Sequence, residues 1–153
     1  MRYPVKLSVF LLILGGGAMQ LARASLGGDA ASVAADATEL HGVTRATPLQ
    51  QYSIEEITND SGIRVREFLN RDGIVFAVTW NGPVVPNLRT LLGSSFDSYI
   101  KGLGAITHPG TRRSLRLASG ELVVESGGHM RAYGGRAYLP PLIPAGASPA
   151  DLR

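Results

Sequence analysis

The chain contains 153 residues, with 15 Lys+Arg against 12 Asp+Glu, an apolar fraction of 44% and no Cys. This length is typical of one domain, and this apolar fraction argues against wholesale disorder. The absence of Cys excludes a disulfide framework, a thiolate metal site and a cysteine nucleophile.

Residues 1–24 are predicted to be a cleavable signal peptide. Arg2 and Lys6 precede an apolar run at 7–14, and Ala22-Arg23-Ala24 gives the small-x-small cleavage pattern. The run is far shorter than the roughly 20 apolar residues of a spanning helix, so we expect no stable membrane span after cleavage. An uncleaved anchor from Leu7 to about Ala22 is the alternative. We expect the mature chain to be exported, either to the periplasm or to the extracellular space.

Cleavage after Ala24 changes the charge balance of the chain. It removes Arg2, Lys6 and Arg23 and leaves twelve basic residues against twelve acidic ones. Nucleic-acid binding normally needs a basic face, so a neutral mature chain predicts no nucleic-acid partner.

Residues 25–50 are interpreted as an Ala- and Gly-rich N-terminal arm. Ser32 is a candidate N-cap of a short helix, and Gly42 is a candidate helix end. The apolar stripe of this helix contains only Val33, Ala37 and Leu40. A mobile arm fits the composition equally well.

Residues 51–81 carry the clearest pattern, that of a three-stranded antiparallel meander. Three runs with strand character, at about 51–59, 63–70 and 74–81, are separated by Asp60-Ser61-Gly62 and by Asp72-Gly73. Asp-Gly between alternating segments favours a two-residue hairpin loop, in which both loop residues have positive φ.

A helix and further strands complete the predicted domain at 51–139. Asn87 is a candidate N-cap, and apolar residues recur at helical spacing from Leu88 to Leu103, where Gly102 and Gly104 end the helix. A second hairpin at 114–118 and 121–126 and an extended stretch at 130–139 follow. We therefore predict an α+β fold. Its antiparallel sheet has five or six strands, the three-stranded meander plus further hairpin strands, packed on one face by a single main helix.

The C-terminal tail at 140–153 contains four prolines. Proline removes a backbone donor, so this segment is expected to run extended over the surface rather than inside the sheet. Ser148-Pro149 is a candidate start of one helical turn.

The register of the meander places one carboxylate on an apolar face. With Asp72-Gly73 as the loop, Leu69 faces Phe76, Glu67 faces Val78 and Val65 faces Trp80. With Asp60-Ser61-Gly62 as the other loop, Glu55 lies opposite Glu67 on the same inner face, and Glu56 pairs with Arg66 outside. Two interpretations follow. In the first, Glu55 and Glu67 form an acid/base pair or a cation-binding pair. In the second, Arg131 or Arg136 neutralises them, or a bulge turns one of them out to water.

A second candidate site surrounds the glycine pair at 127–128. His129 is a candidate acid, base or ligand, and its alternative role is a hydrogen bond that fixes the turn. The predicted binding residues are Trp80, Gly127, Gly128, His129, Arg131 and Tyr133. His41 and His108 fall in predicted loops without ligand spacing, and no metal site and no cofactor are predicted.

Several short segments together carry a resemblance. They are Leu26-Gly27-Gly28, Tyr52, Arg66-Glu67-Phe68, the run from Val75 to Pro83, Pro86-Asn87-Leu88, Leu91-Leu92-Gly93, the run from Glu125 to Arg131, Gly135-Arg136-Ala137 and Leu139-Pro140. On these segments the chain resembles a family of short exported bacterial proteins, the domain of unknown function 2844, over almost the whole mature length. Asn87 and Ser95 depart from the family pattern without changing the predicted fold. The resemblance implies export and a single compact domain, and it implies no activity.

Three functions compete. The first is a non-catalytic binding or cell-envelope accessory protein, whose partner would be a protein of the envelope. Its predicted contact surface is the glycine-rich His129 region with the proline-rich tail, and it predicts an apolar cleft near Trp80 or Tyr133. The second is a small hydrolase or cation-dependent enzyme using Glu55, Glu67 and His129, which would need Glu67 and His129 in one pocket. The third is a subunit of a surface assembly that docks through a sheet edge or through the arm at 25–50.

Overall fold

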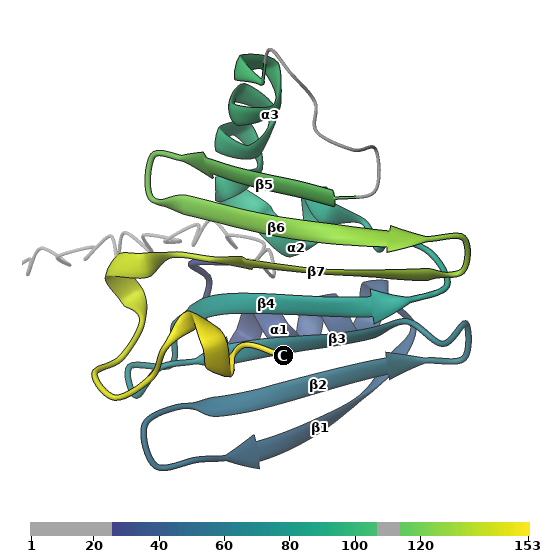
Figure 1. The fold of residues 1–153 in the computed structure, drawn as a ribbon. Helices are drawn as coiled ribbons and strands as arrows, with labels where there is room; N and C mark the ends of the chain where they lie inside the picture. Colours follow the sequence, from purple (N-terminus) through teal and green to yellow (C-terminus); the bar gives the residue numbers. More distant parts are fainter. Residues whose placement is uncertain (1–25, 107–113) are drawn as a thin grey trace, which may run out of the picture.

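The computed structural model describes residues 26–106 and 114–153, which form one seven-stranded antiparallel sheet (Figure 1). The strand order is β1-β2-β3-β4-β7-β6-β5. The strands are β1 (Gly42–Pro48), β2 (Ser53–Asn59), β3 (Arg64–Leu69), β4 (Val75–Gly82), β5 (Ser114–Ser119), β6 (Leu122–His129) and β7 (Ala132–Tyr138). The α+β prediction is confirmed, with more strands than expected. The signal peptide predicted at 1–24 and the loop around His108 lie outside the described residues.

The first loop of the meander has the predicted register. Asn59 and Ile63 close the loop Asp60-Ser61-Gly62, and Glu55 lies opposite Glu67. The predicted ion pair on the outer face is also present, since Arg66 Nε lies 2.6 Å from a Glu56 carboxylate oxygen.

The second loop differs from the prediction by one residue. Asn70 and Ile74 close a three-residue loop in which Gly73 alone has positive φ, at 75°. The Asn70 side chain stabilises this loop by accepting hydrogen bonds from the backbone N–H groups of Asp72 and Ile74. Leu69 therefore lies opposite Val75, and the predicted pair with Phe76 is wrong.

A β-bulge in β4 restores the predicted phase within two residues. The register shifts between Phe68 and Leu69, so Phe76 is the extra residue and joins the second face of the sheet. Glu67 then faces Val78, and Val65 faces Trp80, as predicted.

One face of the sheet is covered by the predicted main helix, which runs over 18 residues at 88–105. It consists of α2 (Leu88–Leu92), the 3₁₀ turn η1 (Gly93–Ser95) and α3 (Phe96–Ala105). Asn87 caps α2 as predicted, because its side chain accepts a hydrogen bond from the Arg89 N–H. The helix continues past Gly102, since the absent side chain there allows α3 to pack directly against Leu117 of β5.

The segment at 26–50 contains a second helix and the first strand. α1 (Ala30–Glu39) is capped by Asp29 rather than by Ser32, because the Asp29 carboxylate accepts a hydrogen bond from the Ser32 N–H. β1 pairs with β2 from Gly42 onward, so the sheet begins before residue 51. α1 lies on the same face as the main helix, behind β3 in Figure 1.

The proline-rich tail covers only part of the second face (Figure 1). It contains two 3₁₀ turns, η2 (Pro140–Leu142) and η3 (Pro149–Asp151), and Ser148 caps the second as expected. Its apolar side chains pack on a cluster centred on Phe68, Phe76 and Tyr138. Away from the tail, Asn81 of β4 and Ser114 and Arg116 of β5 are exposed on this face.

Within the described ranges, none of the helices is both long enough and apolar enough to cross a membrane.

Candidate functional site

Glu67 is a fully buried carboxyl group on the helix-covered face of β3. The group that interacts with it most strongly is the carboxyl group of Asp36 of α1, which is also fully buried. Glu55 of β2, directly opposite on the same face, adds a third acidic group. The sequence predicted the Glu55–Glu67 juxtaposition and missed the closer partner.

The chemistry of this pair requires a proton. Two ionised carboxylates are acceptors only, and in that state none of their four oxygens has a partner among the described residues. When one group holds a proton it can donate a hydrogen bond to the other, and the pair then carries one negative charge instead of two. The pKa of Glu67 is raised to about 9, mainly because burial removes water from the carboxyl group and, to a smaller extent, because of the interaction with Asp36. Desolvation likewise raises the pKa of Asp36 to about 6.

Neither arginine that the sequence offered for neutralisation reaches Glu67. Arg136 binds Glu125 on the opposite face, and Arg131 lies in the exposed β6–β7 turn with a φ of 63°. No ion pair to Glu67 or Asp36 occurs within residues 26–106 and 114–153. The shared proton therefore takes the place of the cation.

His129 is far from this pair. Glu67, Val78, Ala137 and Val124 lie level with one another across four strands, and His129 lies five residues further along β6. Strand geometry puts His129 roughly 20 Å from Glu67. His129 is exposed at the hairpin tip, whereas Glu67 is buried. The structure does not assemble the constellation that the enzyme hypothesis required.

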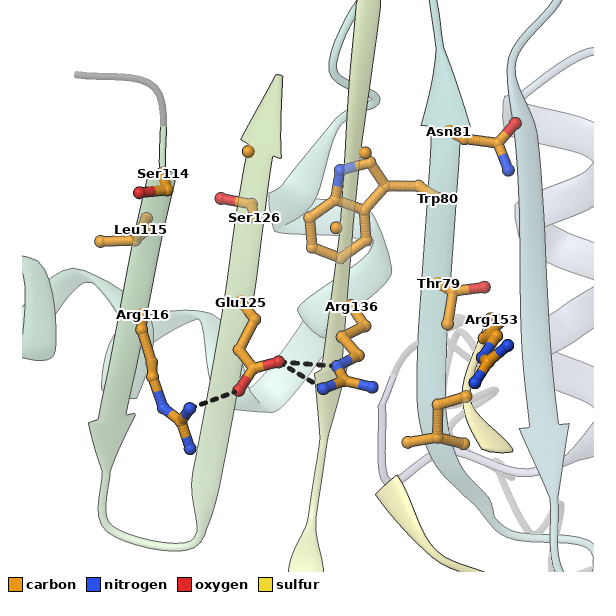
Figure 2. Close-up of a pocket in the computed structure, with 14 residues that line it drawn as sticks. Thr79, Trp80, Asn81, Ser114, Leu115, Arg116, Glu125, Ser126, Arg136 and Arg153 are labelled. Atoms are coloured by element: carbon orange, nitrogen blue, oxygen red, sulfur yellow. Dashed lines mark hydrogen bonds and ion pairs between the residues drawn. The ribbon is translucent and has the colours of Figure 1, made fainter. Parts of the chain in front are cut away.

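An open hollow of about 530 Å³ lies on the second face, beside the tail (Figure 2). Its floor is main chain where Gly127 of β6 lies opposite Gly134 of β7. It is lined by residues of four strands and of the tail: Thr79, Trp80, Asn81, Ser114, Leu115, Arg116, Glu125, Ser126, Gly127, Gly134, Gly135, Arg136, Leu152 and Arg153. The adjacent glycines leave this part of the sheet without side chains to fill it.

Three arginines and one carboxylate set the charge of the hollow. Glu125 accepts hydrogen bonds from Nε and Nη2 of Arg136 at 2.8 and 2.5 Å, and Arg136 also donates to the Pro149 carbonyl oxygen. Arg116 lies 3.4 Å from the same carboxylate, but its side chain is 82% exposed. Arg153 lines the tail side. The hollow therefore carries an excess of positive charge, with Arg136 held by Glu125 and the Pro149 carbonyl oxygen and Arg116 largely exposed.

The predicted binding residues separate into two groups. Gly127 and Trp80 line the hollow, but the Trp80 side chain is only 2% exposed and extends over Gly135 on the helix-covered face. The remaining residues, Gly128, His129, Arg131 and Tyr133, lie toward the hairpin tip outside its lining. The lining around Trp80 mixes charged, polar and apolar groups.

The sequence did not identify Arg116, Glu125, Arg136 or Arg153 as site residues. The available signal was alternation: Glu125 and Gly127 share one face of β6, and Gly134 and Arg136 share one face of β7. No group of three or more potential metal ligands occurs among the described residues.

The fold and the site together define a small α+β protein whose sheet is covered by helices on one face and by the tail on part of the other. Among the described residues, Glu67 and His129 do not share a pocket. The chain belongs to the family of proteins of unknown function DUF2844, whose sequence profile matches residues 22–152. Neither the curated proteins nor the solved structures contain a match.

Proposed function

We propose that the protein is an exported, non-catalytic binding protein of the bacterial cell envelope, and that the hollow beside the tail holds its ligand. Export is supported by the charge, apolar run and cleavage pattern of residues 1–24. The observation that carries the binding role is the hollow itself, a glycine floor bordered by three arginines and one glutamate.

The lining favours an acidic oligosaccharide as the ligand. Arginine binds carboxylates through two parallel hydrogen bonds, and Arg116 has the exposure to do so. Thr79, Asn81 and Ser114 add hydroxyl and amide groups that suit a hydroxyl-rich ligand. The main chain at Gly127 and Gly134 allows a flat ring to approach the sheet closely.

Calorimetric titration of the full chain with an oligogalacturonate tests this proposal. Gly134→Leu, which fills the hollow, and Arg116→Ala are expected to weaken binding at least tenfold. Gly104→Leu is the matched control, because Gly104 is exposed on α3 and a Cβ added there would meet no atom within 4 Å. Equal binding by Gly134→Leu and the unchanged chain would refute the site. Equal binding of a neutral oligosaccharide, or preference for polyglutamate, would refute the ligand class.

The assembly alternative rests on a different observation, the free edge at β1. β1 is the first strand in the sheet order, and Val43 is 79% exposed there. An uncovered edge strand pairs readily with another strand. Analytical ultracentrifugation of the full chain and of Val43→Lys tests this function. It requires that the unsubstituted chain forms an oligomer and that Val43→Lys shifts it toward the monomer.

A further inference from the structure

α1 has few buried side chains. Its buried residues are Ser32, Val33 and Asp36. The Ser32 hydroxyl donates a hydrogen bond to the backbone carbonyl oxygen of Asp29, the helix's own N-cap residue. Asp36 is therefore the buried ionisable side chain that α1 turns toward the sheet, and the group it interacts with there is Glu67 of β3, which is buried and equally without a partner.

The groups around this pair are acidic or apolar. Glu39 lies nearby on α1 and Glu55 on β2, and both raise the cost of a second negative charge. Val78 of β4 lies opposite Glu67, and α2 contributes Leu91 and Leu92 to the same apolar cluster. Within the described ranges, no basic side chain pairs with either carboxyl group.

We infer that Asp36 and Glu67 form a pH-sensitive switch, in which one shared proton holds α1 on β3 and transfer of that proton to hydroxide releases α1 while the sheet stays folded. With the proton, the two groups form a hydrogen bond between helix and sheet. Without it, two negative charges touch in a site from which water is excluded. The repulsion acts between α1 and β3, so separating these two elements relieves it.

The direction of the pKa shifts agrees with this geometry. The pKa of Asp36 is raised to about 6 and that of Glu67 to about 9, so the pair retains one proton between these values and loses it in alkaline solution. Release of α1 would expose Val33 and the partly buried side chains Ala37 and Leu40, which pack on the core when α1 is in place.

Local release is favoured because the strand ladders do not depend on α1. Each of the strands β2, β3, β4, β7 and β6 is paired on both sides. The second face also keeps its own apolar cluster around Phe68 and Phe76. A short helix with few buried residues opens at lower free energy than a sheet core.

Thiol labelling measures this release directly, because the chain has no Cys. Val33→Cys places a thiol on the buried side of α1, and Ala34→Cys places one on the exposed side of the same helix. The ratio of the two labelling rates cancels the pH dependence of thiolate formation. Between pH 7 and pH 10 we expect the ratio, position 33 over position 34, to rise at least tenfold in the otherwise unchanged full chain. It should stay constant when Glu67→Gln is also present, because an amide bonds to Asp36 without a shared proton.

Either of two labelling outcomes, or one spectroscopic outcome, would overturn the inference. The labelling outcomes are a ratio that stays constant in both backgrounds and a ratio that rises equally in both. The spectroscopic outcome is loss of the sheet's far-UV circular dichroism at the pH where position 33 becomes reactive, because that indicates global unfolding. Amide hydrogen exchange of residues 30–39 in the unsubstituted chain provides a second measurement that needs no cysteine. It should accelerate, after correction for pH, while β3 and β4 stay protected.

Discussion

Replacement of Glu67 by Gln should change how the stability of the fold depends on pH. The pKa of Glu67 is about 9 in the folded chain against an ordinary value of 4.5. A raised carboxyl pKa means that the folded chain keeps a proton that the unfolded chain gives up. Stability from this group is therefore complete below pH 4.5 and is lost progressively as the pH rises towards 9.

The size of the stability change between pH 4.5 and pH 7 follows from the two pKa values of Glu67. Each pH unit corresponds to about 1.4 kcal/mol for one proton. Between pH 4.5 and pH 7 the unsubstituted chain should therefore lose about 3 kcal/mol through Glu67. Glu67→Gln lacks this loss, so its stability relative to the unsubstituted chain should rise by about the same amount over this range.

Urea unfolding at pH 4.5, 5.5 and 7.0, followed by fluorescence, measures this difference. Trp80 is the single tryptophan and is buried in the core, so its emission reports unfolding. Glu121→Gln, in the exposed β5–β6 turn, is the matched control for removing one carboxylate. If Glu67→Gln and the unsubstituted chain lose stability in parallel, Glu67 does not carry a proton in the folded state and the reasoning fails.

Three further predictions concern packing and capping. Gly135→Ala should destabilise the chain by about 1–3 kcal/mol, since its Cβ would overlap Trp80 Cζ2, whereas Gly134→Ala, with its nearest atom at 3.5 Å, should be nearly neutral; equal midpoints in urea would contradict this. Asn87→Ala removes the α2 cap and should lower the free energy of unfolding by about 1 kcal/mol, whereas Asn87→Ser, which can still cap the helix, should keep most of that stability. Leu152→Ala removes a side chain only 3% exposed and should cost about 2–5 kcal/mol in thermal or urea unfolding.

Local turn chemistry made much of the meander predictable. The loop Asp60-Ser61-Gly62 needs one residue with positive φ, and Gly62 supplies it at 79°. The Asp72-Gly73 loop was less determined, because Asn70 offered a competing three-residue closure through its side chain. The bulge at Phe76 depends on long-range packing, since its ring meets Tyr52 and Phe68 on the second face. Sequence alternation alone does not predict such a contact.

The position of Glu67 was predictable and its partner was not. Strand alternation places Glu67 inward whatever covers the sheet. Asp36 approaches from a helix separated from β3 by two strands, and such a contact depends on tertiary packing. A signal did exist, since Val33, Asp36, Ala37 and Leu40 share one helical face, which puts a carboxylate within the apolar stripe.

The glycine floor restricts how the proposed ligand specificity can diverge among relatives of this chain. At Gly127 and Gly134 any larger residue narrows the space above the sheet, so substitution there can only close the site. New preferences would have to arise at the border, through the length and charge of residues such as Arg116 and Arg153. We therefore expect homologues that recognise different ligands to share the bare main chain and to differ at its charged margin.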